Sequence, residues 1–271
     1  SYNANGGSGA PSSQTKDWGK DITLSSDHPT QTGYSFLGWS TSSSATSASY
    51  QPGDTFSYNG NYTLYAVWNK IAYKLSYNAN NGTGAPDEQT GATTYTISSV
   101  RPTRVGYNFA GWATSSSASS ASYQPGNTIT LSGNLTLYAV WTQHSISSGS
   151  SLSTAISYAG QIYWYKFTPS TNGTYVMYST GSYDTYCYLY NSAGSQIAYN
   201  DDGGTDSNFR LSYSLSSGTV YYFGVKYYSS SNTGTISAKF GSVYTISYNA
   251  NGGSGAPSSQ TKDWGKDITL S

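Results

Sequence analysis

The sequence predicts a mainly-β protein built from several small modules. Aromatic and aliphatic residues alternate with polar ones at the period of a strand, as in the run IAYKLSYNA at 71–79. Ala, Leu, Glu and Lys are too few and too scattered for long helices. With 16% aromatic residues, such strands can bury enough area to fold despite the abundance of Ser and Gly. Long segments also repeat one another, which indicates modules.

The most unusual repetition joins the two ends of the sequence. Residues 247–271 are identical to residues 1–25 at all 25 positions, at an offset of 246. Such identity is typical of a tandem array, and long internal repeats favour modular, elongated assemblies. We interpret the sequence as an excerpt of an array with a period of 246 residues. Either the polypeptide continues at both ends, or subunits complete each other's sheets.

Composition excludes several classes of function. Charged residues make up 9% of the chain, with 12 basic against 12 acidic. Nucleic-acid binding needs clustered Lys and Arg, so no nucleic-acid partner is expected. No segment approaches 18 apolar residues, so no membrane insertion is expected in this segment. The single cysteine, Cys187, allows no intrachain disulfide and is interpreted as a buried hydrophobic residue.

One module occurs twice, at 1–68 and 71–141. Its opening 14 positions, YNANGGSGAP…QT in the first copy, are identical at 10 positions, and a later stretch of 36 is identical at 26. Asn5-Gly6 and Asn81-Gly82 predict tight turns that need positive φ. The middles differ by a gap of two residues.

A later stretch of each module reads Pro-Thr-x-x-Gly-Tyr-x-Phe-x-Gly-Trp. Strict alternation puts Tyr34 and Phe36 on one face and Trp39 on the other, and it places Trp112 in the same way in the second copy. Trp39 and Trp112 are therefore candidate packing or interaction residues. The module closes on Leu-Tyr-Ala-Val-Trp at 64–68.

This ordered set of motifs resembles the internalin B-repeat, or Listeria–Bacteroides repeat, family. The resemblance covers about 135 residues, since the whole set occurs twice. It implies small β-grasp-like modules of bacterial surface and secreted proteins, in which they serve as surface or adhesive spacers. It carries no catalytic residues.

Residues 144–240 have a different pattern, with about eight short strands separated by turns. The spacing predicts a β-sandwich or jelly roll. The predicted strands are 152–156, 161–167, 173–179, 184–191, 195–200, 209–215, 219–228 and 234–240.

Two motifs in this region suggest a family. The run DTYCYLYNSAGSQIAYNDDGG at 184–204, followed by SGTVYYFGV at 217–225, resembles the bacterial pre-peptidase C-terminal domain. That resemblance implies a secreted β-sandwich accessory. Residues 243–271 then restart the first module, with at most two strands. The predicted fold is thus mainly β, with β-grasp-like modules and a jelly-roll or β-sandwich domain arranged as beads in an elongated repeat protein.

One acidic loop in this region is a candidate metal site. Ca²⁺ takes six to eight oxygen ligands from such loops. The alternative is a solvated turn, in which Asp and Asn bind their own backbone. The candidate calcium ligands are Asp184, Asn200, Asp201, Asp202 and Asp206.

Rows of tyrosines form the second candidate site. Flat aromatic rings can stack on sugars, but a Tyr can also bury its ring in a packed face and keep its hydroxyl in water. We favour packing. The candidate residues are Tyr186, Tyr188, Tyr190, Tyr221, Tyr227 and Tyr228.

No catalytic motif accompanies these features. His28 lies in a loop and His144 in a linker, and no nucleophile elbow, zinc spacing or phosphate loop occurs, so we expect no enzyme. The favoured hypothesis is a structural repeat of an extracellular bacterial fibre or giant cell-surface protein, whose partners are neighbouring repeats or copies of itself. One alternative is an adhesin that binds glycan or protein ligands, with calcium. Another is an accessory region of a secreted hydrolase.

Overall fold

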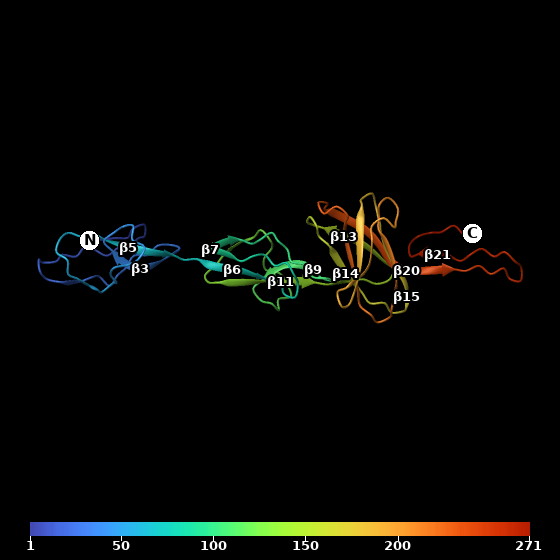
Figure 1. Cartoon of the computed structure of the whole chain (residues 1–271), viewed down its shortest axis with the longest axis horizontal. Helices are drawn as coiled ribbons and strands as arrows, with labels where there is room; N and C mark the ends of the chain where they lie inside the picture. Colours follow the sequence, from blue (N-terminus) through green and yellow to red (C-terminus); the bar gives the residue numbers. More distant parts are fainter. The chain divides into compact units, whose positions relative to one another are not determined.

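The computed structural model describes residues 1–271, and all of its regular elements are β-strands, as Figure 1 shows. The mainly-β prediction is confirmed. The structure contains no helix with the length and apolarity needed to cross a bilayer. Contacts divide the chain into two compact units: Ser1–Ser76 with Asp87–Ile97 and Gly126–Thr136, and Tyr77–Pro86 with Ser98–Pro125 and Leu137–Ser271. The four predicted domain ranges stay predictions.

The first copy of the module contains two small sheets. One sheet has the order β1-β5-β3, in which β1 runs parallel and β3 antiparallel to β5, and the other pairs β2 with β4. A core of Leu24, Trp39, Phe56, Leu64 and Ala66 fills the module. The strands are β1 (Tyr2–Asn3), β2 (Ile22–Thr23), β3 (Tyr34–Ser40), β4 (Thr55–Phe56) and β5 (Leu64–Lys70).

A β-bulge in β3 changes which way its aromatic residues face. The register with β5 shifts between Phe36 and Gly38, so Leu37 has no partner on that strand. Trp39 consequently lies on the same side as Phe36, and the two rings meet edge to face with centroids 5.1 Å apart. The prediction that alternation separates these rings is wrong, because the extra residue breaks the period of two.

The Gly of the Gly-Trp motif makes this bulge possible. Gly38 has φ +131°, and a Cβ on it would lie 2.5 Å from the carbonyl oxygen of Tyr50. In the second copy Gly111 has φ +129°, and Phe109 again meets Trp112 at 5.1 Å. Only glycine combines this φ with so close a backbone approach.

The turn predicted at Asn5-Gly6 is present, whereas the turn of the second copy lies one residue before the predicted Asn81-Gly82. Positive φ occurs at Asn5 and Gly6 in the first copy and at Asn80 and Asn81 in the second. The Asn5 side chain donates Nδ2–H bonds to the carbonyls of Ser43 and Ala66, each at 2.9 Å. The Trp68 indole donates to the Ala4 carbonyl at 3.0 Å. The turn is therefore anchored to the closing strand of its own module.

The second copy of the module repeats this arrangement with a larger sheet. Its strand order is β7-β6-β11-β9, and β8 pairs with β10. The strands are β6 (Tyr73–Asn78), β7 (Gln89–Ala92), β8 (Thr94–Thr96), β9 (Asn108–Ala113), β10 (Thr128–Thr130) and β11 (Leu135–Thr142).

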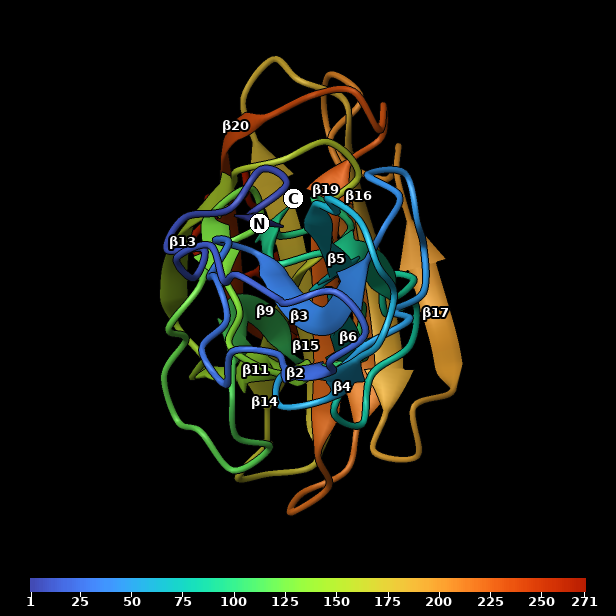
Figure 2. The same cartoon turned by 90° about the vertical axis from the view of Figure 1, so that its left-hand side faces the viewer.

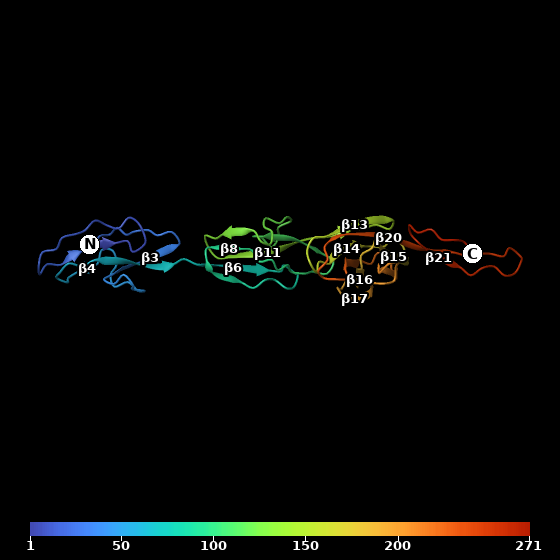
Figure 3. The ribbon, with the colours of Figure 1, turned by 90° about the horizontal axis from the view of Figure 1, so that it is seen from above.

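The following region forms a sandwich of two five-stranded sheets, which Figure 3 shows as two layers and Figure 2 shows with β13 and β17 at opposite sides. One sheet has the order β12-β14-β19-β16-β17; the other has β13-β20-β15-β18, with β21 paired to β20. The strands are β12 (His144–Ser145), β13 (Ser150–Ile156), β14 (Tyr163–Phe167), β15 (Gly173–Thr180), β16 (Thr185–Asn191), β17 (Gln196–Asn200), β18 (Arg210–Leu215), β19 (Tyr221–Tyr227), β20 (Gly234–Ile246) and β21 (Gln260–Asp263).

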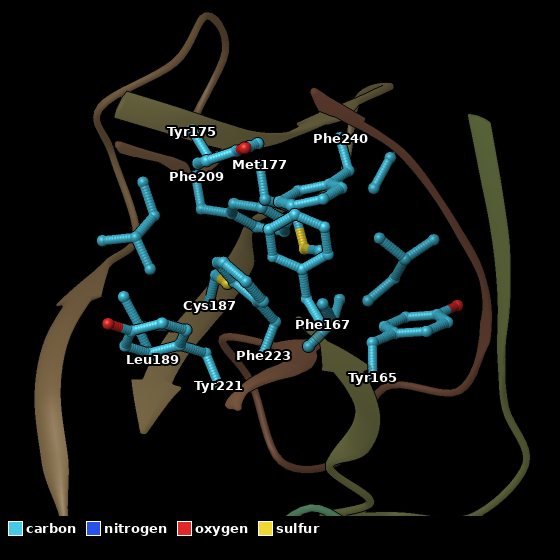
Figure 4. Close-up of a cluster of buried hydrophobic side chains, with 14 of the residues drawn as sticks. Tyr165, Phe167, Tyr175, Met177, Cys187, Leu189, Phe209, Tyr221, Phe223 and Phe240 are labelled. Atoms are coloured by element: carbon cyan, nitrogen blue, oxygen red, sulfur yellow. The ribbon is translucent and has the colours of Figure 1, made fainter. Parts of the chain in front are cut away.

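An aromatic-rich core holds the two layers together (Figure 4). Phe167 and Phe223 both pack edge to face against Phe240, with centroids 4.6 and 5.2 Å away. Cys187 lies inside this core, and burial raises the pKa of its thiol. Such aromatic pairs contribute about 0.5–1.5 kcal/mol each beyond their buried area.

Two segments differ from the predicted strands. β20 continues without a break beyond residue 240, where the predicted strand ends, and pairs Val243–Ile246 with β21. His144, predicted to lie in a linker, belongs to β12 and is in parallel register with Tyr165. In both segments, backbone hydrogen bonds to a neighbouring strand make the residues part of a sheet. Hydrophobic periodicity carries no information on such pairing.

Candidate interaction site

The acidic loop of the sandwich is held by its own backbone hydrogen bonds. The Asn200 Oδ1 accepts bonds from the amides of Gly203 at 2.9 Å and Arg210 at 2.7 Å. The Asp201 Oδ1 accepts the amide of Asp202 at 3.1 Å. These bonds make Asn200 and Asp201 part of a local turn, of the kind that Asp and Asn form with neighbouring backbone.

Three of the candidate calcium ligands are carboxylates that influence one another electrostatically, and the calcium site stays a prediction. Burial, followed by the charges of Asp202 and Asp201, raises the pKa of Asp184, so these three carboxylates influence one another. Asp206 lies on the same loop with positive φ. No three His, Cys, Asp or Glu side chains of the chain are arranged to hold a metal ion.

The tyrosines of β16 line the outer face of their sheet. Tyr186, Tyr188 and Tyr190 are half-buried and alternate with core residues. Tyr186 stacks on Tyr199 with centroids 5.8 Å apart and an interplanar angle of 4°. Burial, with smaller contributions from neighbouring groups, raises the pKa of Tyr186 to about 12. Tyr228 is exposed beside this row.

The other aromatic candidates lie inside cores. Tyr221 and Tyr227 alternate inward on β19 and belong to the sandwich core. Trp39 and Trp112 are fully buried within their own modules. None of these four rings is open to a partner, so their role in the structure is internal packing.

A contact that the sequence did not single out joins the second module to the sandwich. Asn108, a buried residue of β9, forms with its side-chain amide the two hydrogen bonds that the backbone of a neighbouring strand would form. Its Oδ1 accepts the Trp164 amide, and its Nδ2 donates to the Trp164 carbonyl, both at 2.9 Å. The same Nδ2 lies 3.2 Å from the His144 Nδ1. One amide therefore satisfies both backbone groups of a β14 residue.

Two further contacts surround this junction. Gly106, with φ +77°, faces the Tyr222 ring so closely that a Cβ there would lie 2.4 Å from a ring carbon. The Arg101 guanidinium lies over the Tyr158 ring, 4.3 Å from its centroid. Such a cation–π contact contributes about 0.5–2 kcal/mol.

The first module has different residues at two of these three positions and the same glycine at the third. An offset of 73 aligns Ser35 with Asn108 and His28 with Arg101. Gly33, the equivalent of Gly106, has φ +79°, and a Cβ on it would meet nothing within 4 Å. The junction therefore depends on substitutions between two otherwise similar copies, and that comparison is the sequence signal that could have revealed it.

A cleft of about 570 Å³ lies beside the junction. It carries the guanidinium groups of Arg101 and Arg104, and the latter sits 3.8 Å from the Tyr107 centroid. Rings of Trp164 and Tyr190 also line the cleft, but no acidic residue does. Neither arginine has an ion-pair partner in the structure, so their charge is available to a ligand.

A second junction joins the sandwich to the segment after it. Arg210 on β18 donates from Nε and Nη2 to the two carboxylate oxygens of Asp263, at 2.7 and 2.6 Å. The Tyr178 hydroxyl donates to the Trp264 carbonyl at 3.0 Å. Trp264 packs directly on Gly241, where a Cβ would lie 2.4 Å from that side chain. The bidentate Arg210–Asp263 ion pair is a strong and directional type of hydrogen-bonded contact between side chains.

These contacts define a modular β-repeat protein in which modules bind their neighbours through specific side chains. Residues 1–67 and 73–140 match the model of the Listeria-Bacteroides repeat domain, and these two modules belong to that family.

Comparisons with known proteins find partial relatives. Two membrane proteins of Evansella cellulosilytica, one of them named as Gly-rich, are 29% and 34% identical over 134 and 147 residues. The matches cover 49% and 52% of this chain but only 15% and 22% of those proteins. The chain thus spans less than a quarter of the relatives it matches.

A solved pre-peptidase C-terminal domain is a structural neighbour. It comes from the collagenase of Bacillus anthracis and is 13% identical, with a TM-score of 0.29. The match covers 36% of this chain and 91% of that domain.

Proposed function

We propose that the chain is a non-catalytic structural repeat unit of a bacterial cell-surface protein, a fibre or a giant repeat protein, and that module–module packing is its main role. The observation that supports this most directly is the Asn108 junction, in which a buried side chain satisfies both backbone groups of Trp164. A buried, directional contact of this type orients two modules, whereas a free linker would not.

The family supports the proposed surface location. Listeria-Bacteroides repeats match half of this chain, and the relatives found in Evansella cellulosilytica are named as membrane proteins. We infer association with the cell envelope and display on its outer side.

Two measurements test these two parts. Hydrogen exchange of the purified chain should show that the Trp164 amide exchanges only when the junction opens, and Asn108→Ala should increase its rate at least tenfold. Unchanged exchange would contradict the packing role. Protease treatment of intact cells that make the protein should release its peptides without lysis; release only after lysis would contradict surface display.

The arginine cleft favours a second candidate function, that of an adhesin for acidic glycans. Two guanidinium groups without ion-pair partners, beside the half-buried rings of Tyr107 and Tyr158, fit a carboxylate-bearing sugar, since Arg binds carboxylates with two hydrogen bonds and rings stack on sugar faces. Calorimetry with oligogalacturonate tests this. Arg104→Gln, the residue present in the first module at Gln31, should abolish binding, and Gln31→Ala should not. Equal binding of a neutral dextran would contradict it.

A further inference from the structure

One short turn occurs twice in the chain with the same sequence and in two different environments. Asp-Trp-Gly-Lys stands at 17–20 and again at 263–266. In the turn at 263–266, Asp263 is buried and Trp264 is half-buried against the sandwich. In the turn at 17–20, Asp17 is exposed, and Trp18 keeps 87% of its surface in contact with solvent. An indole exposed to this degree can bury a large apolar area when it finds a partner.

The local conformation of the turn is the same in both environments. The Lys20 amide donates to the Asp17 carbonyl at 3.2 Å, and the Lys266 amide donates to the Asp263 carbonyl at 3.2 Å. The Lys–Asp side-chain distance is 3.7 Å in each copy. The exposed turn at 17–20 is therefore already in the conformation that is bound at 263–266, and binding would not require it to refold.

The sandwich offers a complementary face to this turn. Arg210 binds the carboxylate with two hydrogen bonds, and the Tyr178 hydroxyl donates a hydrogen bond to the Trp264 carbonyl. Gly241 leaves room for the indole, and a Cβ on Gly149 would lie 3.6 Å from the same ring. The Lys266 ammonium lies 4.4 Å from the Tyr178 ring centroid. Carboxylate, indole, backbone and ammonium of the turn all have partners on this face.

The turn is absent from the other module. Residues 16–21 of the first module read KDWGKD. The second module has GATT at the equivalent positions 91–94, which is two residues shorter. The module that packs on the C-terminal side of the sandwich thus carries the turn, and the module that packs through Asn108 does not. The insertion that distinguishes the two copies coincides with the element that the sandwich binds.

We propose that the face formed by Tyr178, Arg210 and Gly241 is a receptor for the Asp-Trp-Gly-Lys turn, and that the exposed turn at 17–20 is a ligand for the same face of a second copy of this chain. The inference rests on the proposed packing role and names its partner. Within one chain the turn at 263–266 occupies the face, since a covalently attached ligand has a high effective concentration. The turn at 17–20 binds when that occupant is released.

Sedimentation velocity and light scattering of four full-length forms test this. Asp263→Asn with Trp264→Ala releases the occupant, and we expect this release variant to self-associate with rising concentration to at least twice the mass of one chain. Adding Trp18→Ala to the release variant should return it to a single chain, as should adding Asp17→Asn. The wild type and Trp18→Ala alone should remain single chains.

Two results would overturn the proposal. A release variant that stays monomeric while the sandwich keeps its wild-type unfolding midpoint shows that the free face does not capture the turn. Association that persists after Trp18→Ala shows that another surface is responsible. Hydrogen exchange at the Trp164 amide serves as the independent readout: if it stays slow in all four forms, the Asn108 junction is intact and only the partner named here has failed.

Discussion

The Asn108 side chain pairs with both backbone groups of Trp164, each at 2.9 Å, and so completes the edge of β14 with a side chain from another module. Replacing it with alanine leaves a buried N–H and a buried C=O without partners. We expect Asn108→Ala to lower the free energy of unfolding by about 1–3 kcal/mol. Ser35→Ala, at the equivalent position of the first module, should change it by less than about 0.5 kcal/mol. Urea titrations of both variants provide the comparison, and equal losses would show that the junction contributes nothing specific.

Gly106 and Gly33 separate a steric effect from a backbone effect. Both have φ near +78°, but only Gly106 faces a ring, that of Tyr222. Alanine at either position costs about 1 kcal/mol for the left-handed backbone. Gly106→Ala should lose about 1–3 kcal/mol more, because its methyl group overlaps Tyr222. Thermal unfolding followed by calorimetry measures the difference; similar midpoints would mean that Tyr222 moves aside freely.

The bulge glycine is a stricter position. Gly38→Ala places a methyl group 2.5 Å from the Tyr50 carbonyl and strains φ at +131°. We expect a loss of about 3 kcal/mol or more, since both overpacking and backbone strain apply. Near-ultraviolet circular dichroism of Trp39 should report loss of its fixed environment. Gly53→Ala, with φ +86° and free space around it, is the control and should retain that signal.

The Arg210–Asp263 pair predicts a pH dependence. Hydrogen bonds from Arg210 lower the pKa of Asp263 below its ordinary value. Its folded pKa lies below its unfolded one, so the stabilisation is fully present above about pH 4 and is lost as pH falls through the folded pKa. Hydrogen exchange at the Trp264 amide, bonded to the Ser242 carbonyl, should therefore accelerate below pH 4. Asp263→Asn should remove this dependence, whereas Asp17→Asn, in the identical sequence, should leave it unchanged.

Much of the fold could be predicted from local patterns. Alternation located the sandwich strands because each buries one face, as in β16, where Cys187 and Leu189 are inside and Tyr188 is outside. The turn at Asn5-Gly6 was predictable since positive φ is a property of one or two residues. The facing of Trp39 was not, because a single bulged residue inverts everything that follows it.

The candidate sites divide in the same way. Residue type alone suggested the acidic loop and the tyrosines, but whether Tyr227 faces the core or the solvent depends on its register in β19. Neither junction could be located from residue type or local pattern. Asn108 and Arg210 are ordinary surface residues until another module lies against them, and their partners are 56 and 53 positions away.

The sequence by itself determined the repeat, its module family, the β class and the turns, because each is encoded by local spacing or by identity between copies. Only the tertiary structure decided which residues join the modules. Identical Asp-Trp-Gly-Lys turns are solvent-exposed at 17–20 and bound at 263–266, so the sequence of the turn does not fix its state. The physical reason is that a residue is buried and hydrogen-bonded only where a second surface lies against it, and a distant part of the fold supplies that surface.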